Sequence, residues 1–198
     1  MAIRAVFFDL GGVIIRTEFQ APRQRLADRL NMEYEDLVRL VFESETSRTA
    51  SLGQLSVGEH WAAVAKRLGR PASEADTLYA EFFAGDVIDR DLIAFIRSLR
   101  PAYHTGVISN AWGDMRSYLA AQKFDDAFDS LTISAEVGML KPDPRIYRRA
   151  LEQAGVRPAE SIFVDDTPAN VDACIDLGMA GIVFKDREQT LNEIKRLI

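Results

Sequence analysis

The sequence predicts an α/β protein with a doubly wound parallel sheet and a helical cap inserted after the first strand. Short apolar runs of the kind found in buried strands alternate with helical patterns along the C-terminal half. Residues 16–86 instead carry helical patterns and no convincing strand. Several of the apolar runs also end in polar residues, which would place those residues at one edge of the sheet.

The strands are expected where short runs are rich in β-branched and aromatic residues. These runs lie at residues 3–8, 105–109, 130–134, 161–164 and 181–184. Most of them lack the apolar–polar alternation of a strand that has one face in water. Strands buried on both faces are typical of a parallel sheet that helices cover on both sides, so we expect a Rossmann-like core.

Two of the helical patterns have clear start and stop signals. In "KPDPRIYRRALEQAG", Asp143 is the expected N-cap, Pro144 the first helical residue and Gly155 the stop. The stretch "DTPANVDACIDLG" follows the same order, with Thr167 as the expected cap. The order strand, helix, strand, helix therefore continues to the end of the chain.

The N-terminal half is predicted to contain the cap. Its helical patterns lie at residues 20–31, 34–47, 56–69 and 73–84. An insert of this length is too long for a crossover connection between two strands, so we expect it to form a separate small domain. The predicted organisation is an α/β core of residues 1–15 and 87–198 with a cap of residues 16–86.

Composition excludes several classes of function. The net charge of −6 argues against a protein that binds nucleic acid or an anionic membrane, since both need a basic surface. Cys174 has no partner for an internal disulfide, and two histidines are too few for a histidine-built metal site. The apolar runs are too short for a signal or a membrane span. We expect a cytoplasmic monomer or homodimer whose chemistry uses carboxylates.

Polar residues follow three of the predicted strands. Asp9 ends the first strand, Ser109 and Asn110 end the second, and Asp165 and Asp166 end the run at 161–164. Because the carboxyl ends of parallel strands meet at one edge, these side chains should lie close together.

The chemistry expected at that edge is phosphoryl transfer. Close carboxylates are tolerated when a hard cation such as Mg²⁺ takes oxygen ligands from them. Lys141, in "GMLKPDP", could balance the remaining charge, and Ser109 with the N–H groups after it offers donors to phosphoryl oxygens. A nucleophile, a divalent ion and donors around the phosphoryl oxygens are what such a reaction needs.

Four segments together carry a family resemblance. The stretches "FFDLGGV", "VISN", "LKPDPRIY" and "FVDD", in this order and spacing, resemble the haloacid dehalogenase superfamily over nearly the whole chain. The similarity is greatest to its small-cap phosphatases, namely sugar-phosphate phosphatases whose first motif reads Asp-Leu-Gly. The segment "ISNAWGDM" also resembles the second motif of the phosphatase domain attached to soluble epoxide hydrolases.

The resemblance implies roles for the residues that carry the chemistry. Asp9 would be the nucleophile that forms an aspartyl-phosphate. Ser109 and Asn110 would bind the transferring phosphoryl group of a small phosphorylated metabolite. Lys141 would pair with Asp9 and with the phosphate.

The resemblance also implies a Mg²⁺ site. Its ligands would be Asp9, Asp165, Asp166 and the backbone carbonyl of Gly11. For Asp166, a role in orienting Asp165 or a bound water is the alternative.

One position departs from the family pattern. Most phosphatases of the superfamily carry a second Asp two residues after the nucleophile as general acid and base, and here that position is Gly11. We favour a Mg²⁺-dependent sugar-phosphate-like phosphatase. Glu18 is a candidate replacement acid, although the favoured interpretation of this residue is a solvated acid before a helix. A metal-independent 2-haloacid dehalogenase and a lapsed enzyme with a binding or regulatory role remain alternatives.

Substrate choice is expected to come from the cap. Its aromatic residues Phe19, Phe42 and Trp61 are predicted to pack between cap helices rather than to contact substrate. Trp112 follows the "VISN" segment and is expected near the site, against either a substrate or the cap. Arg16 and Arg48 are candidate contacts to a second anionic group of the substrate, but we favour the interpretation that both are exposed arginines without such a role.

Overall fold

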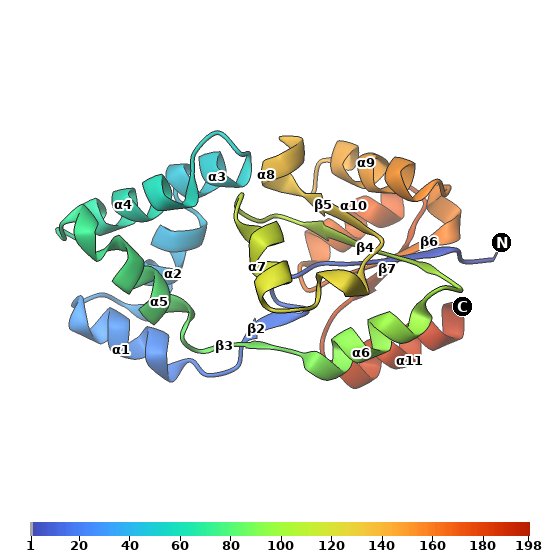
Figure 1. The fold of residues 1–198 in the computed structure, drawn as a ribbon, viewed down its shortest axis with the longest axis horizontal. Coiled ribbons are helices and arrows are strands. Elements are labelled where there is room, and N and C mark those ends of the chain that lie inside the picture. The colour runs from blue at the N-terminus through green and yellow to red at the C-terminus, as the bar shows by residue number, and fades with distance from the viewer. Residues whose placement is uncertain (1) are drawn as a thin grey trace.

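The computed structural model describes residues 2–198 and contains a five-stranded parallel sheet (Figure 1). The strands lie in the order β5-β4-β1-β6-β7, so the first strand of the chain is central. Their bounds are β1 Ala5–Phe8, β4 His104–Ser109, β5 Ser130–Ile133, β6 Ser161–Asp165 and β7 Ala180–Val183. Every pairing in this sheet is parallel, which confirms the predicted fold class.

The central strand β1 shows why its sequence lacks alternation. Its side chains point alternately to the two faces of the sheet, and all four are fully buried. Val6 and Phe8 belong to one hydrophobic cluster, whereas Ala5 and Phe7 belong to another. Both faces therefore need apolar residues.

Helices cover both faces of the sheet. One face carries α6 Arg90–Leu99, α7 Met115–Ala121 and α11 Arg187–Leu197, and the other carries α9 Pro144–Ala154 and α10 Pro168–Asp176. In Figure 1, α9 and α10 lie above the sheet while α6 and α11 lie below it. Single turns complete this half: α8 Ser134–Val137 and the 3₁₀ helices η2 Asp125–Ala127 and η3 Pro158–Glu160.

The expected helix ends are observed in part. Asp143 accepts a hydrogen bond from the N–H of Arg145, and Gly155 ends α9 in the left-handed conformation with φ of 63°. Thr167 precedes α10, but its side chain makes no capping bond. The carboxylate of Asp165 accepts the Thr167 N–H instead, at 2.8 Å. The start of α10 is therefore tied to the end of β6.

Five helices follow one another between two short strands at the left of Figure 1. They are α1 Ala21–Arg29, α2 Tyr34–Phe42, α3 Glu45–Ser51, α4 Val57–Arg67 and α5 Ala75–Phe83, with the 3₁₀ helix η1 Ala72–Glu74 before the last. They share a hydrophobic cluster of their own, centred on residues such as Leu37, Trp61 and Phe82. The helical pattern at 34–47 is two helices, because Ser44 caps a new one.

Two strands were not expected from the sequence. β2 Ile15–Thr17 and β3 Asp86–Ile88 form an antiparallel pair at the two ends of the helical segment. Each has three half-buried residues, which is too short for a recognisable period. Their pairing joins residues far apart in the sequence, so no local pattern could show it. Among residues 2–198, no helix combines the length and apolar character that a membrane crossing requires.

Candidate active site

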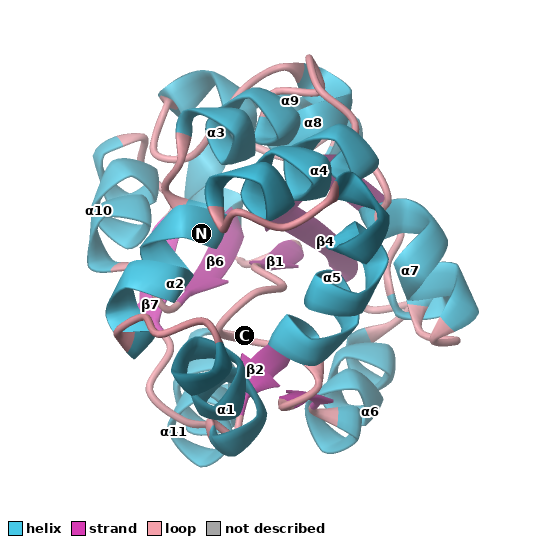
Figure 2. Ribbon diagram, turned by 90° about the vertical axis from the view of Figure 1, so that its left-hand side faces the viewer, coloured by secondary structure: helices cyan, strands magenta, loops and turns pink. Residues whose placement is uncertain are grey.

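Asp9 lies at the carboxyl end of the central strand. Figure 2 views the molecule from the side of α1–α5, with β1 and β6 behind these helices. The strand pairing continues through the Asp9 N–H, which donates to the carbonyl of Val164 at 2.8 Å. The Asp9 Oδ1 atom accepts the N–H of Leu10 at 2.7 Å. The backbone thus holds this carboxylate in one orientation.

Lys141 joins Asp9 to Asp165. Its Nζ lies 2.9 Å from Oδ2 of Asp9 and 2.6 Å from Oδ2 of Asp165. All three residues are buried. The Nδ2 of Asn170 donates to both oxygens of Asp165 at 3.1 Å. One ammonium group therefore faces two buried carboxylates that have further hydrogen-bond donors.

The edge carries more negative charge than Lys141 can balance. Burial raises the pKa of Asp9 to about 6, against the opposing effect of Lys141 and with a further increase from Asp165. Burial and then the charge of Asp165 also raise the pKa of Asp166. Asp9, Asp165 and Asp166 each offer a carboxylate oxygen, and these oxygens lie within 4.8 Å of one another. Oxygen donors with excess negative charge suit a hard divalent cation.

The two glycines after Asp9 differ in what they allow. Gly12 has φ of +74°, and a Cβ there would lie 2.0 Å from a carboxylate oxygen of Asp166. Gly12 is therefore required for the close approach of the loop after β1 to Asp166. A Cβ at Gly11 would meet no atom within 4 Å. Packing therefore does not exclude a side chain at the position where the family resemblance predicts a second Asp.

The loop after β4 is fixed to its neighbours by side chains. Ser109 is buried, and its hydroxyl acts to lower the pKa of Asp9, which places it beside that carboxylate. The side chain of Asn110 donates to the carbonyl of Lys141 at 3.0 Å and accepts the Lys141 N–H at 2.8 Å. The Ser134 hydroxyl accepts the N–H of Ala111 at 3.0 Å and also lies 3.1 Å from its carbonyl. Neither the Asn110 clamp nor the role of Ser134 is visible in the sequence, because both join distant loops.

The candidate replacement acid lies in the β2 region. Glu18 accepts a hydrogen bond from Arg16 at 2.9 Å. Arg16 also donates to Asp89 at 2.9 Å and to the carbonyl of Val13 at 2.6 Å. The structure therefore places both Glu18 and Arg16 in an ion-pair network between β2 and the residue after β3.

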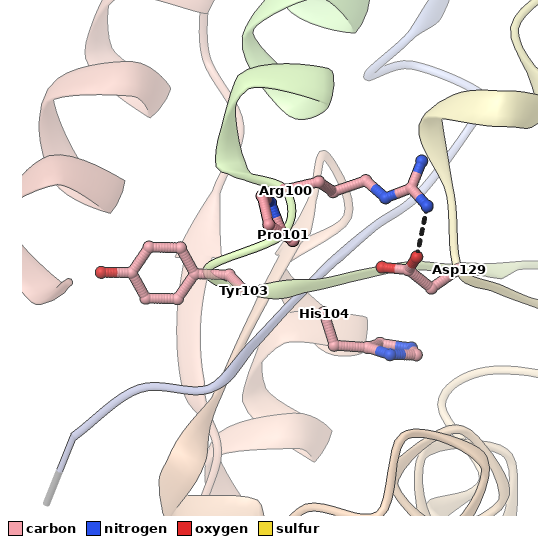
Figure 3. A pocket seen from close by; sticks show the side chains of 5 residues that line it. All are labelled: Arg100, Pro101, Tyr103, His104 and Asp129. Atoms are coloured by element: carbon pink, nitrogen blue, oxygen red, sulfur yellow. Dashed lines mark ion pairs between the residues drawn. The ribbon is translucent and has the colours of Figure 1, made fainter.

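A cavity of about 440 Å³ lies away from this cluster (Figure 3). It is lined by Arg100, Pro101, Tyr103, His104 and Asp129, and Arg100 pairs with Asp129 at 2.7 Å. His104 begins β4 whereas Ser109 ends it, so the cavity lies at the opposite edge of the sheet, roughly 17 Å along the strand. It is not part of the candidate active site.

Comparison with known proteins identifies the family. The sequence model of the haloacid dehalogenase-like hydrolases matches residues 3–178. The chain belongs to this family of hydrolases, which confirms the resemblance carried by the four sequence segments.

Curated relatives include phosphatases. The chain is 28% identical to D-ribitol-5-phosphate phosphatase of Bacteroides thetaiotaomicron, with 89% of each chain covered. It is 26% identical to the sesquiterpene phosphatase astK of Aspergillus oryzae, covering 98% of this chain and 96% of the relative. It is 24% identical to rat bifunctional epoxide hydrolase 2, where all of this chain matches 39% of the relative. The chain thus spans about two fifths of the epoxide hydrolases that it matches.

Solved structures show the same fold. A HAD-family enzyme from Bacteroides thetaiotaomicron, crystallised with magnesium and inorganic phosphate, has a TM-score of 0.76 at 22% identity and covers 96% of this chain and 99% of its own. A predicted HAD-like hydrolase from Porphyromonas gingivalis has a TM-score of 0.79 at 23% identity, covering 100% and 98%.

Proposed function

We propose that the protein is a Mg²⁺-dependent phosphatase that hydrolyses a small phosphomonoester through an aspartyl-phosphate on Asp9. One observation carries this proposal. Three carboxylates and one buried lysine, from three separate strand ends and loops, meet beside the hydroxyl of Ser109. The family and its phosphatase relatives support the same reaction.

Asp9 is the proposed nucleophile. A carboxylate oxygen attacks phosphorus, the P–O bond to the alcohol breaks, and the alcohol oxygen takes a proton. Water then cleaves the acyl phosphate, which releases phosphate and regenerates the carboxylate. The bonds from Leu10 and Lys141 orient the carboxylate before the substrate arrives.

The phosphoryl group is proposed to bind between two loops. Ser109 and Lys141 supply a hydroxyl and an ammonium group to its oxygens. Asn110 is proposed to bind the phosphoryl group through its backbone, because its side chain hydrogen-bonds to the backbone of Lys141. The lysine loop and the serine loop are thereby held together.

The residues that would hold Mg²⁺ are Asp9, Asp165 and Asp166, together with the carbonyl of Gly11. Their oxygen chemistry and the excess negative charge of the edge match that ion. When bound, it would neutralise charge on the phosphoryl oxygens.

The helical segment is proposed to select the leaving group. We assign residues 16–86 to a cap and residues 1–15 and 87–198 to the core. The relatives are named for phosphates of different compounds, D-ribitol for one and a sesquiterpene for another. We propose a sugar-phosphate-like metabolite as the first class to examine. The cytoplasmic location and the choice between monomer and homodimer stay predictions.

The test is phosphate release from p-nitrophenyl phosphate and acetyl phosphate, with Mg²⁺ and with EDTA. Release that depends on Mg²⁺ is expected. Equal release in EDTA would contradict the metal requirement. Halide release from a 2-haloacid without phosphate release would favour the dehalogenase alternative, and no turnover of any substrate would favour a lapsed enzyme.

A further inference from the structure

Trp112 belongs to the core by sequence and to the cap by packing. It lies three residues after Ser109, so the two Cα atoms are at most about 11 Å apart. Its ring packs against the hydrophobic cluster of α1–α5. Among the described residues of that cluster, Trp112 is the one that does not come from the segment between β2 and β3.

Three cap helices contact the ring of Trp112. The ring centroid of His60, from α4, lies 4.8 Å away. Phe42, at the end of α2, stacks on Trp112 at 6.2 Å with an interplanar angle of 25°. Phe83, at the end of α5, makes an edge contact at 6.2 Å. A single side chain therefore contacts α2, α4 and α5, three helices that are separate in the sequence.

The backbone before Trp112 is held firmly to the core. Asn110 clamps the backbone of Lys141, and Ser134 holds both polar groups of Ala111. Ala111 and Ser134 are buried. Trp112 thus follows a fixed loop whose other end carries Ser109, the residue whose hydroxyl acts to lower the pKa of Asp9.

A second contact between cap and core lies beside the same loop. A Cβ at Gly53, just after α3, would lie 2.0 Å from the carbonyl oxygen of Ala135. The two backbones therefore touch closely there. Ala135 follows Ser134, the residue that holds Ala111. Both contacts place the cap relative to the loop that carries Ser109.

We propose that Trp112 is a positioning residue that sets the cap above the reacting carboxylate, an inference that rests on the proposed function. Energy from binding the leaving group contributes to the reaction only if the groups that bind it are held in register with Asp9. A substrate large enough to reach the cap depends on Trp112. A substrate confined to the core does not.

The test compares two substrates in a Trp112→Ala variant. For 4-methylumbelliferyl phosphate, kcat/KM is expected to fall about tenfold, mainly through a lower kcat, because the bound leaving group is no longer held in register with Asp9. For acetyl phosphate, whose leaving group is small, kcat/KM is expected to stay within about twofold. Trp112→Phe, which keeps a ring in the cluster, should restore most of the loss. If the alanine variant does not fold, Trp112→Leu carries the same comparison.

Tyr79→Ala is the matched control. Tyr79 packs on Trp61 and Phe83 within the cap, so its removal loosens the same cluster without removing the ring that comes from the core. It is expected to leave the ratio of the two kcat/KM values unchanged, even if the free energy of unfolding falls.

Two outcomes would overturn the inference alone, in a wild-type protein that hydrolyses both substrates. One is an unchanged ratio in the Trp112 variants, and the other is an equal loss for both substrates. A wild-type protein that hydrolyses neither substrate with Mg²⁺ would instead overturn the proposed function, and this inference with it.

Discussion

The carboxyl edge of the sheet and the helices α1–α5, our proposed cap, are held together by different forces. At the edge, Asp9, Lys141 and Asp165 form a buried ion cluster with directional hydrogen bonds. In the cap, rings around Trp61 and Phe82 pack mainly edge to face. Directional bonds fix individual atoms, whereas apolar packing tolerates small changes with a graded loss of stability. Substitutions at the edge should therefore affect turnover first, and those around the cap should affect stability or substrate choice first.

The segments that connect α1–α5 to the sheet, which contain β2 and β3, are held by a third kind of contact, namely ion pairs to one buried carboxylate. The buried Asp89 follows β3 and accepts hydrogen bonds from Arg16 of β2 and Arg187 of α11, each at 2.9 Å. It also caps α6 through the N–H of Leu92. One carboxylate thus connects the segment of β2, the segment of β3 and the last helix, α11.

The largest effect is expected for Asp9→Asn. An amide cannot form the aspartyl-phosphate, so turnover of p-nitrophenyl phosphate should fall by about 10⁴-fold or more. The measurement is phosphate release at saturating substrate with Mg²⁺. Circular dichroism should show an unchanged fold, because the substitution conserves shape. Turnover equal to the wild type would rule out Asp9 as the nucleophile.

The two adjacent glycines provide a matched pair. Gly12→Ala should lower the free energy of unfolding by about 2 kcal/mol and reduce turnover, because a Cβ there meets Asp166 and the backbone has a positive φ. Gly11→Ala should change the free energy of unfolding by less than about 0.5 kcal/mol, since its Cβ enters open space. Urea unfolding measures both. Equal losses would show that the loop after β1 is not shaped by Asp166.

A smaller effect is expected for Asp89→Asn. The asparagine keeps the oxygen that accepts from Leu92 and Arg187, but it replaces the oxygen that accepts from Arg16 with an NH₂ donor. It also removes the negative charge opposite both arginines, so the free energy of unfolding should fall by about 1–2 kcal/mol at pH 7. Both arginines remain partly exposed and can return to water, which limits the loss. Turnover of acetyl phosphate should change little.

The loss of stability in the Asp89→Asn variant should depend on pH. Burial alone would raise the pKa of Asp89, but the Leu92 N–H, Arg187 and Arg16 together lower it below its ordinary value of 3.8. Because the folded state has the lower pKa, the stabilisation is present above pH 3.8 and is lost as the pH falls below that value. The difference between wild type and variant in urea unfolding should therefore shrink at low pH. A difference that grows there would contradict the direction of this shift.

The fold was largely predictable because the core strands are buried on both faces. A run such as "AVFF" needs no tertiary information to be recognised, since every side chain in it must be apolar. The strands at 15–17 and 86–88 were missed for the opposite reason. They are short and half-buried, and they form only because these two segments meet after the chain has folded.

The candidate site was predictable in part. Polar residues at strand ends can be placed together from topology alone, which is why Asp9, Asp165 and Asp166 were expected to meet. The Asn110 clamp and the Ser134 anchor were not expected, because each joins loops whose distance depends on the final packing. Nor does the sequence distinguish Gly11, where space is open, from Gly12, where none is left.

The sequence by itself determined the parallel sheet, the inserted helices and the sheet edge where the carboxylates gather, because burial and strand direction are encoded locally. Only the tertiary structure decided which donor binds which oxygen, and that the ring of Trp112 packs against the hydrophobic cluster of α1–α5. Those contacts connect segments far apart in the chain. Their geometry is set by the packing of the elements between them and not by any local pattern.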